Sequence, residues 1–232
     1  NRHLQWANVD TYFFALNEGN KGRKRDIYTL GFRLFAQPAQ GYVDYEIESM
    51  YQFGEARTGD YFAHRHHGEV GYSFTTKLPF RLAYLFDYSS GTKDPNKHFD
   101  FLYAKRRGEY GPTGILCIFF PTNIFSPAGF RATLVPTPTV SFSIMHRAFW
   151  LANERGAFFG SGLQDSTGQS NSFLGNLFDI NLKWNPTTSY LRRMQFDIGF
   201  THLFKGSYFK RVAQSPGSRD TNYGYTMVTF SF

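Results

Sequence analysis

The chain has 232 residues, a formal net charge of +7 and 19% aromatic side chains, of which 27 are Phe and 15 are Tyr. Its mean hydropathy is only −0.41, which excludes a bundle of apolar transmembrane helices, and its single Cys excludes a disulfide within the chain. High aromatic content with low hydropathy favours strands that alternate between lipid-facing and water-facing side chains.

Apolar and polar residues alternate with a period of two along most of the chain, which predicts ten strands. Each predicted strand has one apolar and one polar face, except the first, whose faces are ambiguous. The predicted strands are Asn8–Asn17, Asp26–Gln37, Tyr42–Phe53, Arg65–Thr75, Phe80–Ser89, Ile124–Val135, Thr139–Leu151, Phe173–Trp184, Tyr190–Leu203 and Tyr223–Phe232.

The last predicted strand places Val228 and Phe230 on one face and Met227 and Thr229 on the other. A soluble sandwich can also end on such a strand, but an uncovered aromatic edge would recruit other chains. Closure of a barrel in a membrane pairs both edges of this strand and sets its apolar face against lipid.

The connections between these strands alternate in length. Short ones are expected at Pro38–Gly41, Thr76–Pro79, Pro136–Pro138 and Asn185–Ser189, and long ones at Glu18–Arg25, Gly54–His64, Ser90–Asn123, Ala152–Ser172 and Phe204–Asp220. Because successive strands reverse direction, every short connection falls on one side, which is typical of an outer-membrane barrel with periplasmic turns. Aromatic residues near strand ends fit the interfacial girdles of such a barrel, namely Tyr42, Trp150, Trp184 and Tyr190. The sequence therefore predicts an all-β, antiparallel up-and-down transmembrane barrel.

Alternation assigns the charged strand residues to the lumen. The basic ones are Arg33, Arg81, Arg131, Arg147, Lys183 and Arg193, and the acidic ones are Asp44, Glu46, Glu48, Glu69, Asp87, Asp179 and Asp197. All of the basic residues except Arg147 lie within about five residues of a predicted periplasmic turn, and most carboxylates are expected higher. This predicts a basic collar that concentrates a polyanion, because guanidinium groups bind carboxylates in a bidentate fashion. The alternative is that these charges pair with acidic neighbours and only keep the lumen wet.

The excess positive charge lies mainly in the long loops, at Lys21, Arg23, Lys24, Arg25, Lys105, Arg106, Arg107, Lys205, Lys210 and Arg211. Lys105, Arg106 and Arg107 belong to the longest loop, which can fold over or into the pore, so they join the candidate pore-lining residues with Asp179 and Asp197. The alternative for the loop cations is contact with anionic lipopolysaccharide.

Other chemistry has weak support in the sequence. His64, His66 and His67 crowd one junction, but alternation points His66 and His67 to opposite faces, which disfavours a shared metal ion. No nucleophile elbow or glycine-rich phosphate loop is present. The aromatic side chains lie opposite the lumenal charges, which disfavours nucleic-acid binding. We expect no catalytic residue, no cofactor and no metal.

Five stretches occur in an order that resembles the alginate export family of outer-membrane barrels. They are Tyr88–Asn96, Gly111–Ile115, Asn123–Pro127, Arg147–Ala152 and Thr201–Gly206, within a resemblance that covers roughly Gly68 to Phe232. The family's barrel has eighteen strands, so the resemblance implies that residues 1–232 form a single barrel domain that is the C-terminal portion of a larger barrel. A self-contained ten-stranded barrel is the alternative.

The resemblance also implies passive export of an anionic, alginate-like polysaccharide through an arginine-rich pore in the bacterial outer membrane. The implied partners are this polysaccharide, outer-membrane lipid and lipopolysaccharide, and periplasmic export machinery. A general or small-solute porin, an outer-membrane enzyme with a site at the extracellular rim, and an adhesive or structural barrel remain alternatives.

Overall fold

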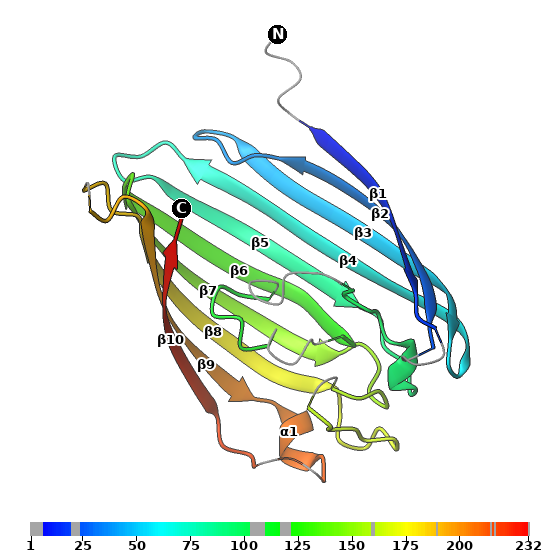
Figure 1. The fold of residues 1–232 in the computed structure, drawn as a ribbon. Helices are drawn as coiled ribbons and strands as arrows, with labels where there is room; N and C mark the ends of the chain where they lie inside the picture. Colours follow the sequence, from blue (N-terminus) through cyan, green and yellow to red (C-terminus); the bar gives the residue numbers. More distant parts are fainter. Residues whose placement is uncertain are drawn as a thin grey trace.

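Ten strands form one antiparallel sheet in which each strand pairs with its neighbour in sequence (Figure 1). The computed structural model describes residues 7–19, 24–102, 110–116, 122–158, 161–188, 190–213, 215 and 217–231. The strands are β1 Asn8–Asn17, β2 Asp26–Ala36, β3 Val43–Ala56, β4 Gly59–Phe74, β5 Phe80–Ser89, β6 Ile124–Thr137, β7 Val140–Leu151, β8 Phe173–Trp184, β9 Met194–Lys205 and β10 Thr221–Phe230. Two short helices, η1 Pro95–Lys97 and α1 Ser207–Arg211, lie in the connections.

The sheet curves into a trough (Figure 1). It is a partial barrel and not a closed one, because within the described residues β1 pairs only with β2 and β10 pairs only with β9. The predicted all-β, antiparallel up-and-down fold is confirmed. No helix among the described residues is both long and apolar enough to cross a membrane.

The two faces of the sheet differ as period-two alternation predicts. The convex face carries large apolar side chains that are exposed, such as Phe130 at 60% and Leu82 at 45%. The concave face carries polar side chains that are buried, such as Asp87 and Thr201. In β1, where the sequence is ambiguous, pairing with β2 sets Tyr12 opposite Gly31, which turns Tyr12 towards the trough.

Most connections have the predicted lengths, and the four that were predicted to be short lie together at one end of the trough. We call this the turn end and the opposite one the loop end. The predicted long loop Gly54–His64 is wrong, because β3 and β4 continue towards each other and leave only residues 57–58 between them. Gly54 lies in this extension of β3 and approaches β2 closely: it has φ +137°, and a β-carbon there would lie 2.0 Å from the Asp26 carbonyl oxygen. The missing side chain at Gly54 permits this close pairing of β3 with β2.

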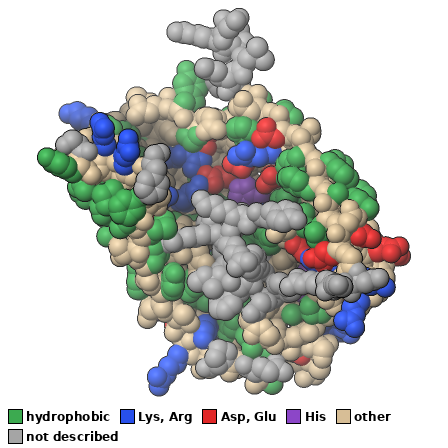
Figure 2. Space-filling model, in the orientation of Figure 1, with side chains coloured by type: hydrophobic (Ala, Val, Ile, Leu, Met, Phe, Trp, Pro, Cys, Tyr) green, Lys and Arg blue, Asp and Glu red, His purple; other side chains and the backbone are tan. Residues whose placement is uncertain are grey.

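The loop end of the trough is filled by its own connections. Tyr110 and Leu116 of the β5–β6 connection, Leu163 of the β7–β8 connection and Tyr208 of α1 pack in one buried cluster with the wall residue Phe149. Apolar burial of this kind is the main stabilising term available to a loop. At the turn end, charged side chains gather in the hollow that the loops leave (Figure 2).

Candidate functional site

Three arginines from three strands meet carboxylates near the turn end. Arg81 of β5 binds Asp44 of β3 in a bidentate fashion, with one Nε–Oδ2 distance of 2.9 Å. Its Nη1 also lies 2.7 Å from Oε1 of Glu69 on β4, which pairs in addition with Arg131 of β6. One carboxylate therefore joins two arginines, and the group crosses four adjacent strands.

Arg33 extends the same arrangement to β1 and β2. Its Nε lies 2.8 Å from Oε1 of Glu46, and its Nη1 lies 3.5 Å from Oδ2 of Asp10. We call the whole group the arginine–carboxylate belt, which consists of Arg33, Arg81, Arg131, Asp10, Asp44, Glu46 and Glu69.

The belt holds three arginines and four carboxylates at one level, so its charges are nearly balanced. The expectation that carboxylates lie above the arginines is wrong for Asp44, Glu46 and Glu69, and the geometry agrees with the alternative of paired charges. Arg33 and Arg131 still keep 31% and 29% of their side chains exposed, so both guanidinium groups can meet a solute in the hollow.

A second charged group lies deeper along the trough, around Asp87. Its carboxylate accepts from Nη2 of Arg147 at 2.6 Å, lies 2.8 Å from Nδ1 of His67 and 3.4 Å from Nη2 of Arg65. Arg147 is fully buried, with its guanidinium carbon 5.2 Å from the centre of the Phe149 ring. We call this group of Asp87, Arg147, His67 and Arg65 the Asp87 cluster, in which one carboxylate meets two guanidinium groups and an imidazole.

Sequence reasoning placed Arg147 in the lumen but missed Arg65 and His67. Both were detectable, since they share the period-two face of Glu69 on β4, and their position at the start of a predicted strand hid them. Arg65, Arg147, Arg131 and Glu69 line one cavity between the belt and the Asp87 cluster, so the two charged groups face a common space.

Asp179 binds the β5–β6 connection instead of facing an open lumen, and Asp197 binds Tyr225 of β10. Asp179 is fully buried and accepts from the backbone N–H of Thr113 at 3.2 Å, from the Thr113 hydroxyl at 2.5 Å and from the Thr201 hydroxyl at 2.8 Å. Asp197 accepts from the Tyr225 hydroxyl at 2.5 Å, and that hydroxyl lies 3.3 Å from the Pro112 carbonyl oxygen. Asp179 therefore holds the connection against the wall, whereas Asp197 fixes Tyr225 of β10.

A second polar anchor holds the start of this connection to β3 and β4. Gln52 and Asp100 exchange two hydrogen bonds, of 2.7 and 2.8 Å, and the Tyr61 hydroxyl donates to the His98 carbonyl at 2.5 Å. Burial lowers the pKa of the His98 imidazole, because desolvation disfavours the charged ring. In the neutral ring, Nε2 lies 2.8 Å from the Thr92 carbonyl oxygen and Nδ1 lies 3.2 Å from the Thr122 hydroxyl oxygen.

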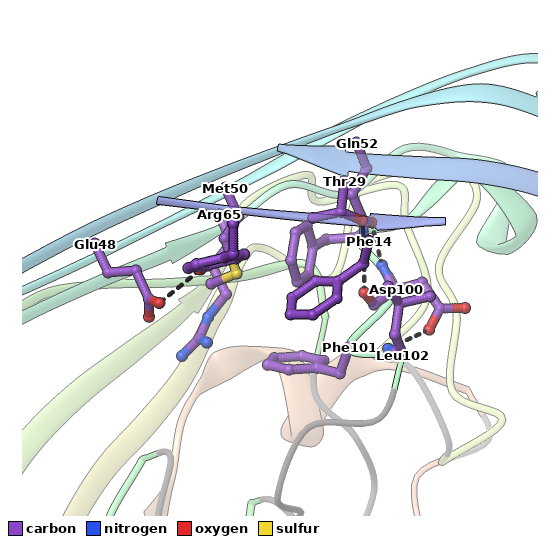
Figure 3. Close-up of a pocket in the computed structure, with 11 residues that line it drawn as sticks. Phe14, Thr29, Glu48, Met50, Gln52, Arg65, Asp100, Phe101 and Leu102 are labelled. Atoms are coloured by element: carbon purple, nitrogen blue, oxygen red, sulfur yellow. Dashed lines mark hydrogen bonds between the residues drawn. The ribbon is translucent and has the colours of Figure 1, made fainter. Parts of the chain in front are cut away.

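A pocket of about 390 Å³ lies between this anchor and the first strands (Figure 3). Phe14 of β1 and Phe101 of the connection approach it from opposite sides, and Glu48 and Arg65 lie beside it. The Tyr12 hydroxyl donates to Glu48 at 2.6 Å and holds that carboxylate in place. The pocket combines apolar rings with charged groups, the combination that binds amphipathic rings such as sugars.

The remaining predicted site residues lie apart from the belt. Lys183 is half-buried on β8 and pairs in register with Asp197. Arg193 lies in the exposed turn before β9, so its predicted position within a strand is wrong; backbone bonds such as Leu191 N–H to Thr188 carbonyl form a turn there. Among the contacts of the described residues, no ion pair joins either of them to the belt. The basic residues Lys105, Arg106, Arg107, Lys21 and Arg23 lie outside the described residues.

The predicted separation of the histidines is confirmed, since His67 faces Asp87 in the trough and His66 faces outwards beside His64. Within the part of the chain that the structure describes, no three His, Cys, Asp or Glu side chains are arranged to hold a metal ion.

Comparison with known protein families gives one match: the model of the family described as "Alginate export" covers residues 1–221. None of the curated proteins searched matches the chain significantly.

Proposed function

The chain belongs to the alginate export family, a transport family of the outer membrane, and on that premise we propose that it forms part of the wall of a passive channel. The channel carries an anionic, alginate-like polysaccharide out through the bacterial outer membrane. The observation that carries the proposal is the two-faced sheet, with buried charged side chains on its concave face and exposed large apolar side chains on its convex face.

The convex face suits a lipid environment in both chemistry and dimensions. In water an apolar surface of this size would drive aggregation, whereas in lipid it is favourable. Trp184 pairs with Val140 at the turn end, and Trp150 lies ten residues further along β7 on the same face. At about 3.3 Å per residue and a tilt near 40°, the two levels are about 25 Å apart, the height of the apolar band between aromatic girdles.

The belt offers a polyanion weak binding sites, because a carboxylate of the polymer can take the place of a protein carboxylate on an arginine. Partly exposed ion pairs contribute only about 0.2–1 kcal/mol each, so a uronate carboxylate can replace Glu46 on Arg33 at little cost. Conduction requires sites that bind strongly enough for entry and weakly enough for release. Paired arginines meet this requirement better than unpaired ones, which would hold a polyanion too tightly.

The β5–β6 connection must move for a polymer to pass. Its described residues pack into the trough at the loop end and are held by the Asp179–Thr113 and Gln52–Asp100 anchors. Polar anchors of this kind contribute about 0.5–1.5 kcal/mol per hydrogen bond, so displacement of the connection is accessible. We therefore assign this connection the role of a plug.

The complete barrel contains more strands than these ten. Unpaired edges expose backbone N–H and C=O groups, which are not tolerated against lipid. In the proposed assembly, residues 1–232 form one portion of a larger barrel, and further strands of the protein pair with β1 and β10.

Current recordings of the full-length protein in planar bilayers test the proposal. We expect anion selectivity, with block by oligouronates and none by neutral dextrans of equal length. Arg81→Ala with Arg131→Ala leaves Asp44 and Glu69 uncompensated, so the reversal potential in a salt gradient shifts towards cation selectivity. Lys97→Ala, in the short helix η1, removes a charge outside the belt and leaves selectivity unchanged. Unaltered selectivity in the double variant contradicts a role for the belt.

A further inference from the structure

Two histidines lie side by side on the convex face of β4. His64 and His66 are separated by one residue, so a strand turns both side chains the same way. Nδ1 of His64 lies 3.0 Å from Nε2 of His66. They interrupt a face that is otherwise apolar, with Phe62 exposed to 63% on one side and Val70 to 48% on the other. Alternation predicts apolar residues at these two positions, so it does not explain why both are histidines.

Neighbouring side chains fix both rings. The Ser49 hydroxyl lies 3.0 Å from Nδ1 of His66 and holds that ring with Nε2 turned towards His64. The Tyr88 ring stacks on His64 with centroids 5.3 Å apart, and the Tyr51 ring meets His66 edge-on at 5.6 Å. A partner that sets the tautomer and orientation of a ring is what metal-binding histidines require.

We propose that His64 and His66 chelate one divalent transition-metal ion on the convex face. With metal–nitrogen bonds of about 2.0–2.1 Å, a nitrogen–nitrogen distance of 3.0 Å corresponds to an angle of about 95° at the metal. This is the angle between neighbouring ligands in square-planar and octahedral geometry, and it is too small for a tetrahedral ion. The site therefore favours Cu²⁺ and then Ni²⁺ over Zn²⁺, with oxygen ligands in the remaining positions.

The inference is independent of the channel, because His67, which binds Asp87 in the trough, lies on the opposite face of the same strand. Ser49 acts as a positioning residue, since it holds His66 without facing the metal.

The test is a calorimetric titration of the untagged full-length protein in detergent with Cu²⁺, Ni²⁺ and Zn²⁺. All variants carry His3→Ala, which removes an imidazole outside the described residues. We expect one strong Cu²⁺ site, weaker Ni²⁺ binding and the weakest binding for Zn²⁺. His64→Ala and His66→Ala each weaken Cu²⁺ binding at least about tenfold, and Ser49→Ala weakens it less. His146→Ala, which removes a convex-face histidine on β7, leaves binding unchanged.

Electron paramagnetic resonance of the Cu²⁺-loaded parent protein needs no further variant. A hyperfine pattern from two equatorial nitrogens supports the site. A pattern with one nitrogen or none overturns it, and so does a His64→Ala, His66→Ala double variant that binds Cu²⁺ as tightly as the parent.

Discussion

Replacing Asp87 with Asn removes the carboxylate that Arg147, His67 and Arg65 share. Arg147 is fully buried, so the substitution leaves its guanidinium group desolvated without the carboxylate that binds it at 2.6 Å. Loss of one partner from a buried ion pair costs about 3–5 kcal/mol, because the remaining charge stays desolvated. We therefore expect Asp87→Asn to lower the free energy of unfolding by about that amount.

Two matched variants separate charge burial from mere loss of a contact. Arg147→Met leaves Asp87 with His67 at 2.8 Å and fills much of the same volume, so we expect a smaller loss, of about 1–3 kcal/mol. Asp10→Asn removes a carboxylate that is 52% exposed and lies 3.5 Å from its arginine, and it costs less than about 1 kcal/mol.

The assay is urea unfolding of the full-length protein in lipid vesicles, followed by tryptophan fluorescence. The expected order of destabilisation is Asp87→Asn, then Arg147→Met, then Asp10→Asn. If the free energies of unfolding of Asp87→Asn and Asp10→Asn differ by less than about 1 kcal/mol, then the Asp87 cluster is not desolvated and its description as a buried charge group is wrong.

Three further predictions concern the plug and the two glycines Gly54 and Gly59 of β3 and β4. Thr113→Val removes the hydroxyl that binds Asp179, so single-channel recordings should show longer open times and a higher mean current; unchanged gating would contradict the plug. Burial lowers the pKa of His98 below its usual 6.5, so the unfolded or released loop takes up a proton more readily than the docked loop. The stability that neutral His98 contributes is complete above about pH 6.5 and is lost as the pH falls below it; currents should therefore rise at low pH in the parent protein and not in His98→Gln. Gly54→Ala places a β-carbon 2.0 Å from the Asp26 carbonyl oxygen at φ +137°, so the variant should unfold at a markedly lower urea concentration. Gly59 has φ +105° but open space around it, so Gly59→Ala should lower the free energy of unfolding by only about 1–2 kcal/mol. Equal losses of stability in the two variants would contradict the close pairing of β2 and β3.

The sequence predicts the strands and their faces well because period-two alternation is a local property. The bounds Phe173–Trp184 and Phe80–Ser89 agree with β8 and β5 residue for residue. Alternation gives no answer where both faces are aromatic, as in β1, whose Tyr12 and Phe14 turn inwards only because of the register with β2. It also does not predict the end of β3, which continues beyond Phe53 through Gly54 to Ala56.

The composition of the site depends on which residues meet across strands, and that is not a local property. Glu69 binds Arg81 and Arg131, which follow it by 12 and 62 residues, and only the register of β4, β5 and β6 brings them together. The positions of the arginines near the predicted turns therefore predicted a basic collar where the structure pairs them with carboxylates. The anchors of the plug were also out of reach, since Thr113 meets Asp179 from within the long connection of residues 90–123, whose described part contains no strand.

Cysteine accessibility at two adjacent positions of β6 tests the central claim most directly. In a Cys117→Ser background, Thr133→Cys lies on the concave face beside Arg81, and Ala132→Cys lies on the convex face beside Leu82. A charged, membrane-impermeant thiol reagent is added to the full-length channel during current recording. The account predicts that Thr133→Cys reacts, changes the current and is protected by oligouronate, while Ala132→Cys does not react. Reaction at Ala132→Cys with none at Thr133→Cys, or reaction at Thr133→Cys that oligouronate does not slow, would contradict it.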